Sequence, residues 1–108
     1  MTDIRFYTDA TGRAPFEEWL NAMNDTQGRA RIRARLARLQ AGNFGDCKPL
    51  RDGVQELRID HGPGYRVYLS RQGPVLVLLL CGSDKGEQDK AIKLALAYLA
   101  DWKQRGET

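Results

Sequence analysis

The chain has 108 residues, and its 17 lysine and arginine residues against 14 aspartate and glutamate residues give a formal net charge of +3. This length predicts one domain over residues 1–108, and contents of 42% hydrophobic and 29% charged residues exclude a disordered tail. The longest apolar run, residues 75–81, is far shorter than the roughly 20 residues that cross a bilayer.

The sequence holds two cysteines and one histidine, which limits the chemistry available to it. Cys47 and Cys81 lie far apart, whereas a short extracellular domain usually carries a larger disulfide framework. The N-terminus lacks a basic and then apolar leader, so we expect a cytoplasmic protein without membrane association. His61 has no second histidine or cysteine at ligand spacing, so we expect no metal and no cofactor.

The first half of the chain reads as a strand followed by two helices. A short strand is expected over residues 4–7, and Pro15 stands at a plausible first position of a helix. An N-cap among residues 24–26 precedes a second helix, which runs from residue 29 to just before Gly42. The Gly-, Asp- and Pro-rich stretch that follows, up to residue 53, predicts a loop.

The second half reads as three strands and a closing helix. The strands are expected over residues 54–60, 65–70 and 75–81, and the helix begins at residue 87. Short turns between the strands allow only antiparallel neighbours, so they form a meander. The element order β-α-α-β-β-β-α predicts an α+β fold, a small, mostly antiparallel sheet with helices packed on it. The third meander strand is apolar on both faces, whereas the first two alternate and leave one open face.

Most basic residues lie in the middle of the chain, and arginine outnumbers lysine twelve to five. Guanidinium groups bind phosphate through paired hydrogen bonds, which indicates an anionic partner. At 100° per residue, the second helix has two arginines on one flank of its apolar stripe and three on the other. These are Arg29 and Arg33, then Arg31, Arg35 and Arg38. The same arginines would also suit a solvated helix face.

Alternation along the first two meander strands places four polar side chains on the open face, namely Glu56, Arg58, Arg66 and Tyr68. A loop bearing Lys48 and Arg51 is expected beside them. Arginines that bind phosphates and a tyrosine that stacks on a base are what single-stranded RNA requires. The alternative is cross-strand ion pairing of Glu56 with one of the arginines on a wet sheet face.

Four short motifs occur in order on these elements: ELR at residues 56–58, GYRVY at 64–68, LCGSDK at 80–85 and QDK at 88–90. With them the sequence resembles the RelE/ParE superfamily of toxins from bacterial toxin-antitoxin systems, in particular the HigB-like addiction module killer proteins. The resemblance covers residues 6–102 and includes the order of the elements, so it implies a RelE-like fold.

The resemblance implies a ribosome-dependent, metal-independent endoribonuclease that cuts messenger RNA, inhibits translation and arrests growth. A cognate helix-turn-helix antitoxin would neutralise it, and the complex of the two would bind promoter DNA. By position, Arg58 and Arg66 match phosphate-site residues, and Lys85 matches a catalytic basic residue. Lys90, in the last motif, joins Lys48, Arg51 and Tyr68 as a candidate for RNA binding.

The proton-transfer group is the point at which the sequence departs from the family. Many relatives carry a tyrosine or histidine near the last helix, whereas residues 87–90 contain neither. His61 could replace it if its hairpin folds over the sheet face, and Asp89 is a second candidate, although His61 also fits an exposed turn. Two other functions stay open: a ParE-like DNA gyrase inhibitor without nuclease activity, and an inactive relative that only binds the antitoxin.

Overall fold

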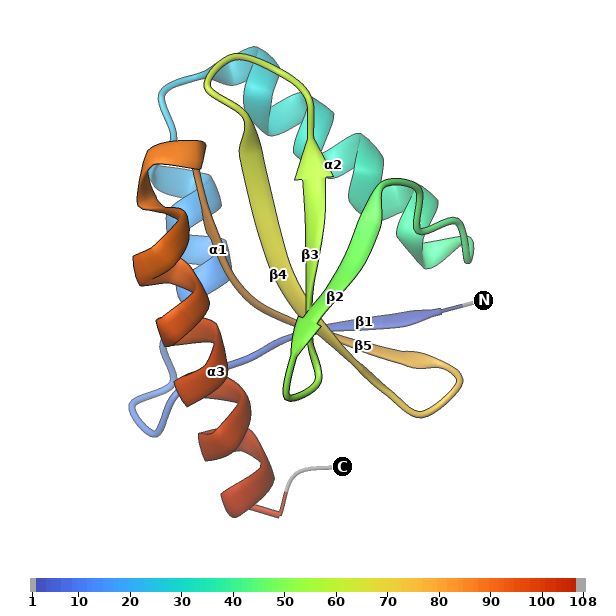
Figure 1. Cartoon of the computed structure of the whole chain (residues 1–108), viewed down its shortest axis with the longest axis vertical. Helices are drawn as coiled ribbons and strands as arrows, with labels where there is room; N and C mark the ends of the chain where they lie inside the picture. The colour runs from blue at the N-terminus through green and yellow to red at the C-terminus, as the bar shows by residue number, and fades with distance from the viewer. Residues whose placement is uncertain (1, 107–108) are drawn as a thin grey trace.

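The computed structural model describes residues 2–106, which form a five-stranded mixed sheet with helices on both faces (Figure 1). The protein is therefore α+β, as the sequence predicts, with one strand more than expected. The elements in chain order are β1 (Asp3–Phe6), α1 (Pro15–Ala22), α2 (Thr26–Gln40), β2 (Cys47–Arg51), β3 (Val54–Ile59), β4 (Tyr65–Gln72), β5 (Leu76–Ser83), the 3-10 turn η1 (Lys85–Glu87) and α3 (Gln88–Gln104).

The strands lie in the order β1-β5-β4-β3-β2. The last four strands of the chain form an antiparallel meander, and β1 joins its β5 edge in parallel. The third strand of the expected meander is apolar on both faces, a pattern that predicts an interior strand, and this is confirmed because β5 has a partner on each side and is buried along almost its whole length. Both sheet edges, β1 and β2, are short strands.

The strand β2 lies within the stretch that the sequence predicts to be a loop. Pro49 lacks an N–H and disfavours strand in a sequence pattern, but β2 is an edge strand, where a proline is tolerated. The turn into β3 is formed by Asp52 and Gly53, whose φ angles of 51° and 87° are those of a tight hairpin turn. An Asp-Gly pair before an alternating strand is a hairpin signal, so the sequence did contain an indication of β2.

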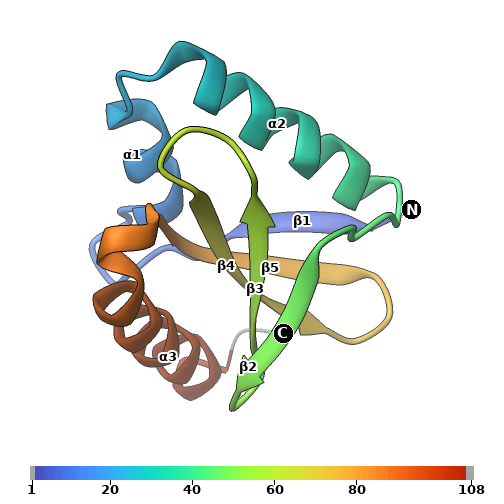
Figure 2. The ribbon, with the colours of Figure 1, turned by 45° about the horizontal axis from the view of Figure 1, so that its top comes forward.

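Helices cover both faces of the sheet, with α1 and α2 on one side and α3 on the other (Figure 2). Leu57, Val67 and Leu69 pack in the core under α1 and α2, whereas Tyr68 packs in the core under α3. The prediction that this face of the sheet is open is therefore wrong over much of its area. Glu56 and Tyr68 are both 0% exposed, because the apolar side of α3 lies on that face.

Two helix starts show why the chain turns helical where it does. Pro15 is the first residue of α1, as predicted. The carboxylate of Asp25 caps α2 by accepting a hydrogen bond from the Gly28 N–H at 2.9 Å, so that α2 begins at Thr26, earlier than expected. Within residues 2–106 no helix is both long and apolar enough to cross a membrane.

Candidate functional site: a cationic pocket at the β3–β4 hairpin

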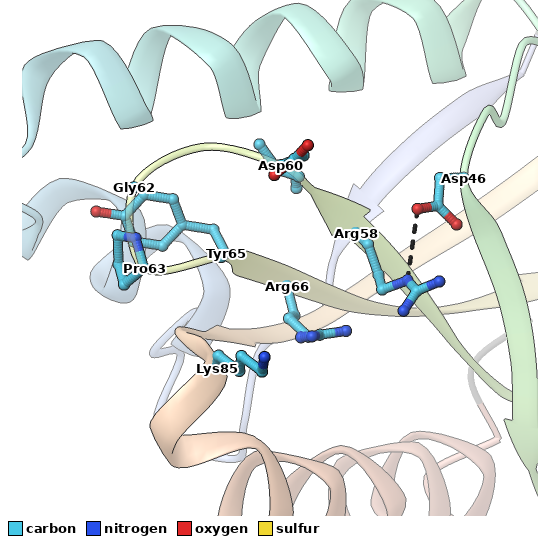
Figure 3. A pocket seen from close by; sticks show the side chains of 10 residues that line it. Asp46, Arg58, Asp60, Gly62, Pro63, Tyr65, Arg66 and Lys85 are labelled. Carbon is cyan, nitrogen blue, oxygen red and sulfur yellow. Dashed lines mark ion pairs between the residues drawn. The ribbon is translucent and has the colours of Figure 1, made fainter.

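A pocket of about 370 Å³ opens where β3 and β4 join, beside the start of η1. Three cationic side chains line it: Arg58 from β3, Arg66 from β4 and Lys85 from η1 (Figure 3). The remaining wall includes Asp46, Asp60, Tyr65 and the hairpin residues 62–64. Three of the side chains that the sequence analysis assigns to a catalytic site thus share one pocket.

The β3–β4 pairing brings the two arginines together. Arg58 and Arg66 are direct cross-strand partners, so their side chains leave the sheet on the same face. Like charges directly opposite each other repel, and each arginine is balanced by its own carboxylate. Arg58 Nε lies 3.4 Å from Asp46 Oδ2 at the surface, while Arg66 Nη1 donates a 3.0 Å hydrogen bond to Glu56 Oε1.

Glu56 is the buried anchor of Arg66. Its other oxygen, Oε2, accepts hydrogen bonds from Gln88 Nε2 at 2.8 Å and from the Tyr68 hydroxyl at 3.3 Å. The Tyr68 hydroxyl also lies 3.4 Å from Ser83 Oγ. Because Gln88 follows η1 directly, this one carboxylate ties Arg66 to the turn that carries Lys85. The cross-strand pairing considered as an alternative is thus present between Glu56 and Arg66, alongside the shared pocket, but it is buried and does not lie on a wet sheet face.

Tyr68 is a correction to the sequence analysis, which places it on an exposed face as a base-stacking residue. Its ring is 0% exposed and belongs to the core under α3, so no base can stack on it in this structure. Burial raises the pKa of Tyr68 to about 12, so the hydroxyl stays protonated, as a hydrogen-bond donor, well above neutral pH. Tyr68 therefore supports Glu56.

Lys85 begins η1 and is exposed. The turn is fixed by Asp84, whose carboxylate accepts hydrogen bonds from the backbone N–H groups of Gly86 and Glu87 at 2.9 and 3.2 Å. Among residues 2–106, no carboxylate forms an ion pair with Lys85. Its ammonium group is thus positioned by a capped turn while its charge stays unneutralised beside the two arginines.

The structure does not bring His61 into the pocket. His61 Nε2 lies 3.6 Å from Asp25 Oδ2, on the far side of the hairpin, and the Tyr65 hydroxyl donates a 2.8 Å hydrogen bond to the same oxygen. The hairpin residues Gly62 and Gly64 have φ angles of 56° and 82°. Side chains rarely adopt such angles, so this hairpin conformation depends on glycine and was not predictable from hydrophobic spacing.

The remaining predicted site residues lie outside the pocket. Lys48 and Arg51 are exposed on β2 rather than in a loop, and Arg51 borders a separate hollow that also includes Asp89. Lys90 borders a third hollow, between α3 and Trp19. The sequence indicated no functional role for three acidic residues of this region. Two line the pocket, Asp46 and Asp60, and the third, Glu56, supports Arg66. Alternation and register already place Glu56 near Arg66, and what the sequence did not indicate is the burial of Glu56 under α3.

Within residues 2–106 no three His, Cys, Asp or Glu side chains gather in a way that could hold a metal ion. What the pocket offers is positive charge and hydrogen-bond donors, which suit an anionic ligand.

These features define a small α+β protein with a cationic surface pocket. An uncharacterized protein of Haemophilus influenzae is 58% identical to this chain over 80 residues, which are 74% of this chain and 81% of that protein. The chain belongs to the same family as that protein. No protein-family model matches the chain. Because the relative is itself uncharacterized, its likeness assigns no activity to this chain.

Proposed function

We propose that this protein is a toxin of the RelE/ParE type, belonging to a toxin-antitoxin module, and that it cleaves messenger RNA at the ribosome. The observation that carries the proposal is the meeting of Arg58, Arg66 and Lys85 in one pocket. All three come from the motifs by which the sequence resembles that superfamily. A RelE-like topology, extended by the edge strand β2, is part of the same proposal.

The pocket can stabilise the charge that develops when RNA is cleaved. Attack of a ribose 2′-oxygen on the adjacent phosphorus places extra negative charge on the phosphoryl oxygens, and fixed cations lower the energy of that state. Arg66 is held at Nη1 by Glu56, whereas its buried Nε has no hydrogen-bond partner within the described part of the chain. An unpaired buried donor is costly, and because this atom is closed to solvent, a phosphate oxygen satisfies it only once the Arg66 side chain shifts towards the pocket.

The pocket also holds a group that can accept the proton. Asp46 is paired with Arg58, whereas Asp60 has no ion pair among residues 2–106. Asp60 takes the proton of the 2′-hydroxyl as the 2′-oxygen bonds to phosphorus. The bond to the 5′-oxygen breaks, and that oxygen takes a proton from the Lys85 ammonium group. The products are a 2′,3′-cyclic phosphate and a free 5′-hydroxyl.

The partners follow from this function. A cognate helix-turn-helix antitoxin neutralises the toxin, the ribosome presents the message, and the toxin reaches promoter DNA only within the toxin-antitoxin complex. These partners come from the family resemblance. The cationic pocket supports them to the extent that an acidic segment of an antitoxin could occupy the place of the phosphates.

The test is induced expression of the chain alone in a bacterial host, with message 5′ ends mapped on a translated and an untranslated reporter. We expect cleavage of the translated message only. Lys85→Gln should lower cleavage by about 100-fold, the usual contribution of a proton-transfer group, whereas Lys93→Gln on α3 removes the same charge outside the pocket and should cleave as the wild type does. Equal cleavage by both variants would remove Lys85 from the mechanism.

A second candidate function is ParE-like inhibition of DNA gyrase without RNA cleavage. It is favoured by the position of His61 beside Asp25, because the pocket then lacks the histidine that the sequence offers for proton transfer. Growth arrest with intact messages, together with inhibition of supercoiling by the purified protein, would establish this function in place of the nuclease. Growth without arrest, despite folded protein, would indicate an inactive regulatory relative.

A further inference from the structure

The helix α2 carries five arginines and no acidic residue. Two of the five are used within the fold. Arg29 donates a hydrogen bond to the Met23 carbonyl at 2.8 Å, and Arg35 donates to the carbonyls of Arg58 at 2.6 Å and Phe44 at 3.2 Å. The other three are exposed and form no ion pair with any of residues 2–106; they are Arg31, Arg33 and Arg38.

The contact of Arg35 with Arg58 shows which way this helix faces. Arg31, Arg35 and Arg38 are spaced i, i+4 and i+7, so they lie on one flank of α2. Since Arg35 reaches the backbone of β3, this arginine flank faces the side of the molecule on which Arg58 borders the cationic pocket. Arg33 lies on the opposite flank.

Positive charge accumulates along this flank, and the carboxylate that acts on Arg35 is that of Asp46. Burial, and then the nearby charge of Arg38, lower the pKa of the Arg35 guanidinium. Arg71 of β4 adds a further cation, with its guanidinium carbon 3.4 Å from the centre of the Phe44 ring. The carboxylate at this edge, Asp46, is paired with Arg58. Such a concentration of one sign of charge attracts polyanions.

The chemistry of the flank favours a nucleic acid over an acidic protein. The exposed positions between its arginines are small alanines such as Ala34, whereas protein interfaces depend on large apolar or aromatic anchors. Arg31 and Arg38 are seven residues apart, about 10.5 Å along the helix. The phosphates of a nucleic-acid strand repeat at regular intervals along its backbone, so two arginines at this spacing can contact two phosphates of one strand.

We propose that the arginine flank, Arg31, Arg35 and Arg38, is a second binding site, which holds the phosphate backbone of RNA outside the pocket. The choice of RNA rests on the proposed function, whereas the preference for a polyanion with regularly spaced charges follows from the charge and spacing of the flank arginines. The flank binds backbone without reading sequence, because Arg31 and Arg38 are exposed and Arg35 is held by backbone carbonyls, so no side-chain partner fixes any of them against a base edge.

The test measures binding of the purified full chain to a short fluorescent single-stranded RNA of mixed sequence over a range of salt concentrations. We expect the double variant Arg31→Gln/Arg38→Gln to bind about tenfold more weakly and to lower the slope of log affinity against log salt by about 1.4, which is two phosphate contacts. The double variant Arg33→Gln/Lys103→Gln removes the same charge elsewhere and should retain the wild-type slope. The double variant Arg31→Lys/Arg38→Lys keeps the charge and should retain most of the wild-type affinity and slope.

Equal losses in the flank variant and its matched control would overturn the inference, since the binding would then reflect net charge alone. So would an equal loss of affinity for polyglutamate, which would indicate an acidic protein as the ligand. Flank-dependent RNA binding without any message cleavage would contradict the proposed function and leave the flank site standing. Message cleavage with flank variants that bind as the wild type does would contradict only the flank site.

Discussion

Two carboxylates hold the β3–β4 hairpin from opposite sides, and their surroundings differ sharply. Glu56 lies under α3, is fully buried, and accepts hydrogen bonds from Arg66, Tyr68 and Gln88. A buried charge is tolerated only while its partners are in place, so this cluster requires each of its donors.

Asp25 performs the corresponding task at the surface. It caps α2 through the Gly28 N–H, accepts the Tyr65 hydroxyl and lies beside His61, while a third of its side chain stays in water. Water can replace a lost partner here. The hairpin therefore has one rigid anchor, Glu56, on the side that faces the cationic pocket, and one adaptable anchor, Asp25, on the other side.

The largest expected effect is at the buried anchor. Glu56→Ala leaves Arg66 without a counter-charge, and we expect the free energy of unfolding to fall by about 3 kcal/mol, the lower end for a broken buried pair because Arg66 borders the pocket. Urea unfolding of Glu56→Ala and of the wild type measures this loss in the free energy of unfolding. Glu87→Ala removes an exposed carboxylate close to the same site and should change stability by less than about 0.5 kcal/mol. Similar midpoints for the two variants would mean that the buried pair carries no stability.

A smaller effect is expected at Tyr68. Tyr68→Phe keeps the ring and removes a hydroxyl whose two contacts are long, so the cost should be about 1 kcal/mol at neutral pH. The folded-state pKa of about 12 lies above the ordinary tyrosine value of 10.0, so the stability that this shift provides is present below pH 10 and is lost as the pH rises towards 12. Urea unfolding from pH 8 upwards should show a shallower alkaline loss in Tyr68→Phe than in the wild type. Parallel curves would exclude Tyr68 as a source of that loss.

The smallest effect is expected at the adaptable anchor. Hydrogen bonds from the Gly28 N–H and then from the Tyr65 hydroxyl hold the pKa of Asp25 below the ordinary aspartate value of 3.8. The stability that this ionised carboxylate provides is therefore present above about pH 4 and is lost as the pH falls through the lower folded-state pKa. Asparagine still caps a helix, so Asp25→Asn should unfold almost as the wild type does at neutral pH and lose less stability on acidification. Asp52→Asn, at an exposed turn, should follow the wild-type acid curve.

Much of the fold was accessible from the sequence, because hydrophobic spacing and turn residues report on each element locally. The sequence did not indicate which helix packs on which part of each sheet face. Alternation correctly grouped Glu56 with Arg58 on one face, but α3 covers the part of that face at Glu56 and leaves the part at Arg58 free. The strand β2 was missed because Pro49 argues against a strand everywhere except at an edge.

The residues of the candidate site also differ in how far the sequence predicts their positions. Arg58 and Arg66 were predictable as neighbours because strand register follows from a short hairpin. Lys85 could be placed near them because the strand that precedes it is interior. The position of His61 depends on two left-handed glycines and on the cap of a helix far away in sequence, which no local pattern contains.

The parallel pairing of β1 with β5 has a consequence for how the chain folds during synthesis. Asp3 pairs with Leu76, so the first strand must wait for the last one before it has a partner, whereas the meander forms from consecutive segments. Contacts so distant along the chain are slow to form, because closing the long intervening loop costs conformational entropy. Lys85 is made later still. The cationic pocket is therefore among the last features completed as the nascent chain lengthens, and ribosome-bound chains that stop before η1 lack it.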